Sequence, residues 1–136
     1  MKTLRLVLAQ LNVTVGDIAG NSRQIRVGLE EARALGADIV VFPEMAITGY
    51  PAEDLLLKPD FIRAAREALE RLRPATSGLI AIIGLPYAGA EASADAGGAL
   101  YNAAAVLQDS ELAVLYYKLH LPNYVVFDEK RYFQSG

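Results

Sequence analysis

The sequence predicts an α/β domain in which a mixed sheet carries its helices on one face. Two observations favour this class. Up to Phe42 the chain reads strand, helix, strand with short connections, which is typical of a right-handed parallel unit. Further on, residues 99–108 and 111–118 are apolar runs separated only by Asp109 and Ser110, which predicts an antiparallel hairpin. Parallel and antiparallel pairing within one chain together give a mixed sheet.

The first unit begins at residues 4–11 (LRLVLAQL), which mix alternation with continuous apolar character, as in a strand covered on both faces. Asn21 is expected to cap a helix that runs to about Leu35. Gly36 stands where a glycine commonly ends a helix. Residues 38–42 (DIVVF) then predict a short buried strand.

The second unit begins at Pro59, which opens a helix running to about Arg73. Residues 79–86 (LIAIIGLP) predict a third strand, and the small polar residues 88–98 predict a surface loop or hairpin tip. The tail, residues 119–136, has no clear period. The apolar positions of the predicted helix share one face: Phe61, Ala65, Leu69 and Leu72.

The composition restricts the classes of function. A length of 136 residues suits one compact domain, and 53% hydrophobic with 21% charged residues indicates a globular chain. The net charge of −3 with scattered Lys and Arg argues against nucleic acid as a partner. No apolar run is long enough to cross a membrane, and the N-terminus lacks a signal-peptide cleavage site, so we expect a cytoplasmic location. The absence of cysteine excludes disulfides and thiolate metal sites.

Two charged residues stand directly after predicted buried strands. Glu44 follows residues 38–42, and Lys118 ends residues 111–118. Sites in open α/β sheets lie beyond the carboxyl ends of the strands, so neighbouring strands would bring these two charges into one pocket. There the carboxylate could act as a general base and the lysine could stabilise an oxyanion. From spacing alone, a surface ion pair of little energetic value is the favoured alternative.

Other polar residues have ordinary explanations. His120, the single histidine, lies between two leucines and is expected to be structural. Glu129, within FDEKRYF, has the context of a solvated loop charge, and Tyr50 is either a core tyrosine or a pocket wall. Glu53 and Asp54 suit the first turn of a short helix. The glycines form no phosphate-binding motif.

Three segments together resemble the nitrilase (carbon–nitrogen hydrolase) superfamily. They are AQLNVTVGDIAGN (9–21), VVFPEMAITGYPAEDLL (40–56) and YYKLHLPNYVVFDEKRYF (116–133), in the order and spacing of that superfamily. GYPAEDLL and NYVVFDEKRYF are similar to the glutaminase domain of glutamine-dependent NAD synthetases. The resemblance covers the chain from Leu4 onward. It implies half of a nitrilase-type α-β-β-α sandwich, with residues 1–136 as the N-terminal part of the glutaminase (amidase) domain and the synthetase domain absent.

The resemblance also implies roles for individual residues. The superfamily hydrolyses amides with a Glu-Lys-Cys triad, in which Glu44 would be the general base and Lys118 would stabilise the tetrahedral intermediate. Glu129 matches a second glutamate that supports the site, and Tyr50 lies in a motif that shapes the glutamine pocket. The ammonia released from glutamine would serve the ATP-dependent amidation of nicotinic acid adenine dinucleotide in a synthetase domain.

The departure from that family is the missing nucleophile, because the chain contains no cysteine. We therefore expect this chain alone to be inactive and to form the N-terminal part of a longer enzyme. No metal or other cofactor is expected in this chain, while ATP and Mg would bind the absent synthetase domain. The expected partners are glutamine, the remainder of the parent chain and further copies in a homo-oligomer. Half a sandwich should also expose an apolar sheet face that the missing half would cover, which predicts self-association of this chain, or a partner, through that face. The alternatives are a stand-alone amidase or carbamoyl hydrolase of the same superfamily, and a non-catalytic assembly module.

Overall fold

The computed structural model describes residues 3–89, 98–125 and 127–136. Within them, one five-stranded sheet has the order β1-β2-β3-β4-β5. The first three strands are mutually parallel, and β4 is antiparallel to both β3 and β5. The predicted mixed α/β sheet is confirmed. The strands are β1 (Leu6–Leu8), β2 (Ile39–Val41), β3 (Ile80–Ala88), β4 (Leu100–Gln108) and β5 (Glu111–Tyr117).

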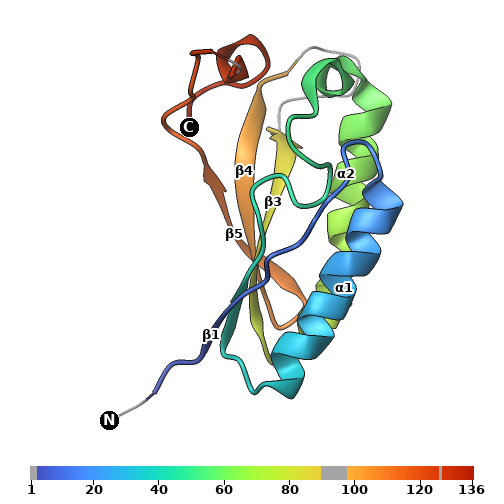
Figure 1. Ribbon diagram of the computed structural model, residues 1–136, viewed down its shortest axis with the longest axis vertical. Coiled ribbons are helices and arrows are strands. Elements are labelled where there is room, and N and C mark those ends of the chain that lie inside the picture. Colours follow the sequence, from blue (N-terminus) through green and yellow to red (C-terminus); the bar gives the residue numbers. More distant parts are fainter. Residues whose placement is uncertain (1–2, 90–97, 126) are drawn as a thin grey trace.

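Two helices, α1 (Ile18–Ala34) and α2 (Pro59–Leu72), lie side by side against one face of the sheet (Figure 1). Their apolar faces and alternate residues of the strands form one continuous core. Burial of this apolar surface is the main favourable term holding the helices on the sheet. The fully buried members include Ile25, Leu29 and Leu69 from the helices and Val40, Ala81, Ile83 and Leu107 from the strands.

The opposite side of the sheet, which we call the open face, carries an apolar row across all five strands. In register the row runs Leu8, Val41, Ile82, Val106 and Val114. Leu8 and Val114 are 73% and 54% exposed, and no helix of the described residues covers this side (Figure 1). The structure thus has the exposed apolar face expected from the sequence. Self-association through it stays a prediction.

The start of α1 corrects one expectation. Asp17, not Asn21, is the N-cap, and its carboxylate accepts a hydrogen bond of 2.8 Å from the Gly20 amide. Asn21 lies inside the helix and is fully buried. Its side-chain amide donates to the carbonyls of Thr14 and Ile47, so it fastens two loops to the helix. Gly36 follows the helix with φ +68°, as the sequence predicted.

The remaining boundaries agree with the sequence to within a few residues. β1 is shorter than residues 4–11, although the Ala9 amide still donates to Val41. α2 ends at Leu72 and continues as a 3₁₀ turn over Arg73–Thr76. The segment predicted to start a short helix is the 3₁₀ helix Glu53–Leu57. Residues 90–97 of the predicted surface loop lie outside the described residues.

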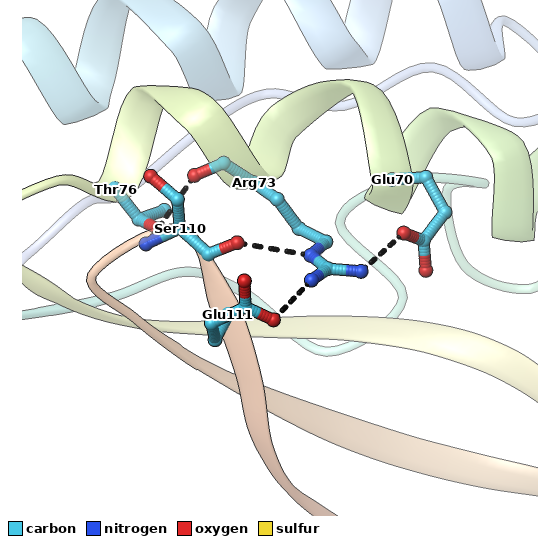
Figure 2. A network of polar contacts seen from close by, with 5 residues as sticks. All are labelled: Glu70, Arg73, Thr76, Ser110 and Glu111. Carbon is cyan, nitrogen blue, oxygen red and sulfur yellow. Dashed lines mark hydrogen bonds and ion pairs between the residues drawn. The ribbon is translucent and has the colours of Figure 1, made fainter.

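A polar network, which we call the hairpin brace, ties the end of α2 to the tight turn between β4 and β5 (Figure 2). Arg73 donates to the Ser110 carbonyl (3.0 Å) and to the carboxylates of Glu70 (2.6 Å) and Glu111. The Thr76 hydroxyl donates to the Arg73 carbonyl and accepts from the Ser110 amide. The turn, Asp109–Ser110, has positive φ at both residues, as a two-residue hairpin requires.

In the part of the chain that the structure describes, neither helix combines the length and the apolar character that a membrane span would need.

Candidate active site

The candidate site lies at the end of the sheet where β2, β3 and β5 finish. Because β2, β3 and β5 point the same way, their carboxyl ends meet at one edge, next to the start of antiparallel β4. The C-terminal segment, red in Figure 1, lies at this end. Glu44 follows β2 after two residues, and Lys118 follows β5 directly. The predicted meeting of these two charges at one sheet edge is therefore what the topology produces.

Four side chains gather here, and we call them the lysine cluster: Glu44, Tyr50, Lys118 and Glu129. Lys118 Nζ lies 2.9 Å from Glu44 Oε1 and 3.0 Å from Glu129 Oε1. The Tyr50 hydroxyl donates a hydrogen bond of 3.0 Å to the same oxygen of Glu129. The structure thus brings together all four residues that the sequence and the resemblance singled out. His120 lies nearby in sequence, but its side chain is exposed.

Gly84 on β3 allows the chain around Glu44 to sit close to the sheet. A Cβ atom at this position would lie 2.6 Å from the Met45 nitrogen, 2.7 Å from the Pro43 oxygen and 2.9 Å from the Glu44 Cα. These are backbone atoms, which could not move aside without disturbing the fold. The Ile47 amide also donates to the Gly84 carbonyl. The glycine therefore lets the turn carrying Glu44 rest directly on β3.

The backbone on either side of Lys118 is fixed by two hydrogen bonds. Its amide donates to the Asn102 carbonyl (2.9 Å), and its carbonyl accepts from the Gly136 amide (3.1 Å). Glu129 opens the short 3₁₀ helix Glu129–Arg131, and its amide donates to the Pro122 carbonyl. Hydrogen bonds therefore hold the backbone of both Lys118 and Glu129 in place.

Burial differs sharply between the two carboxylates. The side chain of Glu129 is 4% exposed, whereas those of Lys118 and Glu44 are 30% and 48% exposed. Glu129 Oε2 is buried and has no hydrogen-bond partner among the described residues. A buried carboxylate needs a cation, and Lys118 supplies it. The expectation that Glu129 is a solvated loop charge is therefore wrong, because its side chain is in the interior. The Glu44–Lys118 pair itself stays partly exposed.

The surroundings keep both donors of the cluster protonated. Partial burial by itself would lower the pKa of Lys118, but hydrogen bonds and attraction from Glu44 and Glu129 outweigh it, so its pKa lies above the usual value. Burial raises the pKa of Tyr50, and the hydrogen bond to Glu129 raises it further. At neutral pH, Lys118 is therefore a fixed cation and Tyr50 a neutral donor.

One residue at the site was not found from the sequence. Asn102 on β4 is 4% exposed, and its side-chain amide donates a hydrogen bond of 2.5 Å to Glu44 Oε1. A signal was present, because Asn102 interrupts the apolar run of residues 99–108, and asparagine is unfavourable in strands.

A cavity of about 250 Å³ lies beside the lysine cluster. Tyr50 and Glu129 form part of its wall, while Glu44 and Lys118 are not among its lining residues. Other parts of the wall come from the 3₁₀ helix Glu53–Leu57 and from the C-terminal segment. Asp54 of this helix joins the two, because its carboxylate accepts a hydrogen bond from the Tyr132 hydroxyl (2.7 Å) and pairs with Arg131 (3.3 Å). Across the described residues, no group of three or more His, Cys, Asp or Glu side chains could hold a metal ion.

The chain has a nitrilase-like α/β fold. An amidase from Nesterenkonia sp. superposes with a TM-score of 0.78 at 24% identity, over 98% of this chain and 48% of the amidase. The family model for carbon-nitrogen hydrolases matches residues 5–136, so this chain belongs to the carbon-nitrogen hydrolase family.

Within that family the chain matches the N-terminal part of glutamine-dependent NAD(+) synthetases. The enzyme from Xylella fastidiosa is 46% identical over 132 residues, which are 96% of this chain and 23% of the relative. The enzyme from Thermotoga maritima is 43% identical over 136 residues, again 23% of its length. The synthetase structure from Acinetobacter baumannii, a complex with adenosine diphosphate, superposes with a TM-score of 0.91 at 36% identity, over 99% of this chain and 24% of that one.

Proposed function

We propose that this chain is the N-terminal part of the glutamine amidohydrolase domain of a glutamine-dependent NAD synthetase. That domain would release ammonia from glutamine for the ATP-dependent amidation of nicotinic acid adenine dinucleotide. The observation that carries the proposal is the contact of Lys118 with both Glu44 and Glu129, in a chain 46% identical to such a synthetase. The chain has no cysteine, so the nucleophile would come from sequence outside these 136 residues.

The first half of the reaction would use Glu44 as a proton carrier. Its carboxylate takes the proton of the cysteine thiol, and the thiolate forms a bond to the amide carbon of glutamine. Lys118, held protonated beside two carboxylates, stabilises the negative charge that develops on the amide oxygen. Glu44 then gives its proton to the departing nitrogen, which leaves as ammonia, and a thioester remains.

The second half would run through the same two residues. Glu44 accepts a proton from water, whose oxygen attacks the thioester carbon, and Lys118 again stabilises the oxyanion. The carbon–sulfur bond breaks, glutamate is released, and the proton on Glu44 returns to the sulfur. Glu129 and Tyr50 do not exchange protons in this scheme. Glu129 helps to keep the ammonium of Lys118 charged and in place, and Tyr50 holds Glu129 through a hydrogen bond.

The cavity beside Tyr50 and Glu129 is our candidate for part of the glutamine pocket, because it opens next to the lysine cluster. ATP and Mg²⁺ would act in the synthetase domain, outside the matched segment. The adenosine diphosphate in the Acinetobacter baumannii relative supports a nucleotide site in that class of protein.

We also propose a homo-oligomer for this chain, supported by the open face with its exposed Leu8 and Val114. Sedimentation of the purified chain would show association that weakens in Val114→Lys. A monomer that persists at high concentration would contradict this part of the proposal.

The proposal can be tested with a chimera in which this chain replaces the 132 matching residues of the Xylella fastidiosa synthetase. We expect the chimera to release glutamate from glutamine and the isolated chain to release none. Amidation with free ammonia serves as the control for an intact synthetase part. Glutamate release by the isolated chain that depends on Glu44 would contradict the proposal. So would a chimera that uses ammonia but does not hydrolyse glutamine.

A further inference from the structure

We propose that Asn102 is a positioning residue for the glutaminase reaction, holding Glu44 Oε1 so that Oε2 is the oxygen that exchanges the proton. This inference rests on the function proposed above and adds an atom-level assignment to it. It starts from the short contact between the Asn102 amide and Glu44.

The contacts of Glu44 distinguish its two oxygens. Oε1 accepts from Asn102 Nδ2 at 2.5 Å and from Lys118 Nζ at 2.9 Å. Two donors engage both lone pairs of that oxygen. Oε2 has no hydrogen-bond partner among the described residues, and the Glu44 side chain is 48% exposed. The proton from a thiol or a water molecule therefore has one accessible acceptor, which is Oε2.

The position of Asn102 explains how it can fix this geometry. It is the third residue of β4, pairs with Pro86 on β3, and is only 4% exposed. Its carbonyl accepts the Lys118 amide at 2.9 Å, while its side chain holds Glu44. Asn102 thus positions Glu44 through its side chain and Lys118 through its backbone.

The chemistry of an amide suits this task. Burying a polar side chain in a sheet is unfavourable unless it forms hydrogen bonds, and an aliphatic residue would fit β4 better. A neutral donor also leaves the charge of the carboxylate unchanged, so Lys118 supplies the electrostatic attraction while Asn102 supplies direction. Orientation of this kind matters because a displacement of about 1 Å can cost roughly 10²-fold in rate.

The test uses the chimera with two substitutions at this position. In Asn102→Leu the branched shape of the side chain is kept and the donor is lost. We expect kcat to fall on the order of 10- to 100-fold with little change in KM, since substrate binding is not affected. Asn102→Asp is isosteric and places a second carboxylate against Glu44. We expect its loss of activity to be largest at neutral and alkaline pH and to diminish toward acid pH, where one proton shared by the pair restores the hydrogen bond.

Thr76→Val is the matched control. Thr76 is fully buried and hydrogen-bonded like Asn102, but it belongs to the hairpin brace at the other end of the sheet. We expect its kcat to stay within about twofold of the unsubstituted chimera, although it too loses a buried hydrogen bond.

Three results would overturn the role of Asn102 in a chimera that is otherwise active. They are an Asn102→Leu variant with kcat within about twofold of the parent, an Asn102→Asp variant with the parent's pH profile, and an equal loss in Thr76→Val. If Asn102→Leu does not fold, the pH profile of Asn102→Asp decides. A chimera with no glutaminase activity before any substitution would instead overturn the proposed function, and the role of Asn102 with it.

Discussion

Two clusters in this molecule have nearly the same composition and lie at opposite ends of the sheet. In the lysine cluster, Lys118 contacts the carboxylates of Glu44 and Glu129. In the hairpin brace, Arg73 contacts those of Glu70 and Glu111 (Figure 2). Each has one cation and two carboxylates, and each joins segments far apart in the sequence.

The difference between them is burial and the use of hydrogen-bonding groups. The carboxylates of the brace are 46% and 76% exposed, and the third contact of Arg73 is a backbone carbonyl. In the lysine cluster Glu129 is in the interior with one oxygen unpartnered, and Glu44 keeps one oxygen open. The same set of charges thus forms a solvated connection in the hairpin brace. In the lysine cluster it forms a constrained cation next to an accessible carboxylate. Composition alone does not distinguish a brace from a candidate active site.

The largest difference is expected in catalysis. In the chimera, Lys118→Met removes the only cation of its cluster, and kcat should fall about 10²- to 10³-fold because the oxyanion loses its stabilisation. Arg73→Met removes a cation of equal charge from the brace and should leave kcat within about twofold. Steady-state glutamate release measures both. Equal losses in the two variants would mean that the clusters do not differ in function.

The stability of the isolated chain should also depend more on the lysine cluster than on the hairpin brace. Lys118→Met leaves buried Glu129 without its cation, and we expect the free energy of unfolding in urea to fall by about 2–4 kcal/mol. Arg73→Met should destabilise less, since exposed pairs contribute little. The double variant Lys118→Met/Glu129→Gln is the control, because it removes the uncompensated charge and should recover part of the loss. A larger effect from Arg73→Met would reverse the comparison.

The alkaline limb of stability should depend on Tyr50. Its pKa in the folded chain is raised above the ordinary 10.0, so the unfolded chain releases this proton first as the pH rises. The unfolded state then binds fewer protons than the folded one, and stability falls above about pH 10. In Tyr50→Phe the free energy of unfolding should fall less steeply at alkaline pH. Its dependence on pH below pH 9 should be unchanged. Urea unfolding at a series of pH values checks this, and an unchanged alkaline slope would count against the Tyr50–Glu129 hydrogen bond.

The smallest effect is expected from Arg73→Lys. The charge is kept, but one ammonium cannot reproduce the fork that reaches Ser110, Glu70 and Glu111 together. The thermal midpoint should fall by less than in Lys118→Met, and kcat of the chimera should not change. A marked loss of glutaminase activity would connect the brace to the site.

Much of the fold could be predicted because its signals are local. Periodicity and turn residues indicated the helix from Pro59, the positive-φ Gly36 and the hairpin at Asp109–Ser110. Asn21 was misassigned because a polar residue near a helix start has the same local pattern whether it caps the helix or is buried in it. One of its two partners, the Ile47 carbonyl, comes from a loop that lies later in the chain.

The site was predictable in part for the same reason. Glu44 and Lys118 stand at strand ends, which a sequence shows. The burial of Glu129 depends on how the C-terminal segment folds over the sheet, and only the family resemblance singled it out. Asn102 depends on the β3–β4 register, which decides the side of the sheet its amide takes. Nothing in its immediate neighbours specifies that side.

The most direct test of the account is the rate of glutamate release by the chimera with Glu44→Gln. Glu67→Gln is the matched control, because Glu67 lies on the surface of α2 and its side chain is 57% exposed. If Glu44 carries the proton, kcat of Glu44→Gln falls about 10²- to 10⁴-fold while Glu67→Gln keeps the parent's rate. A folded Glu44→Gln chimera that hydrolyses glutamine within about twofold of the parent would contradict the assignment of this cluster as the catalytic centre.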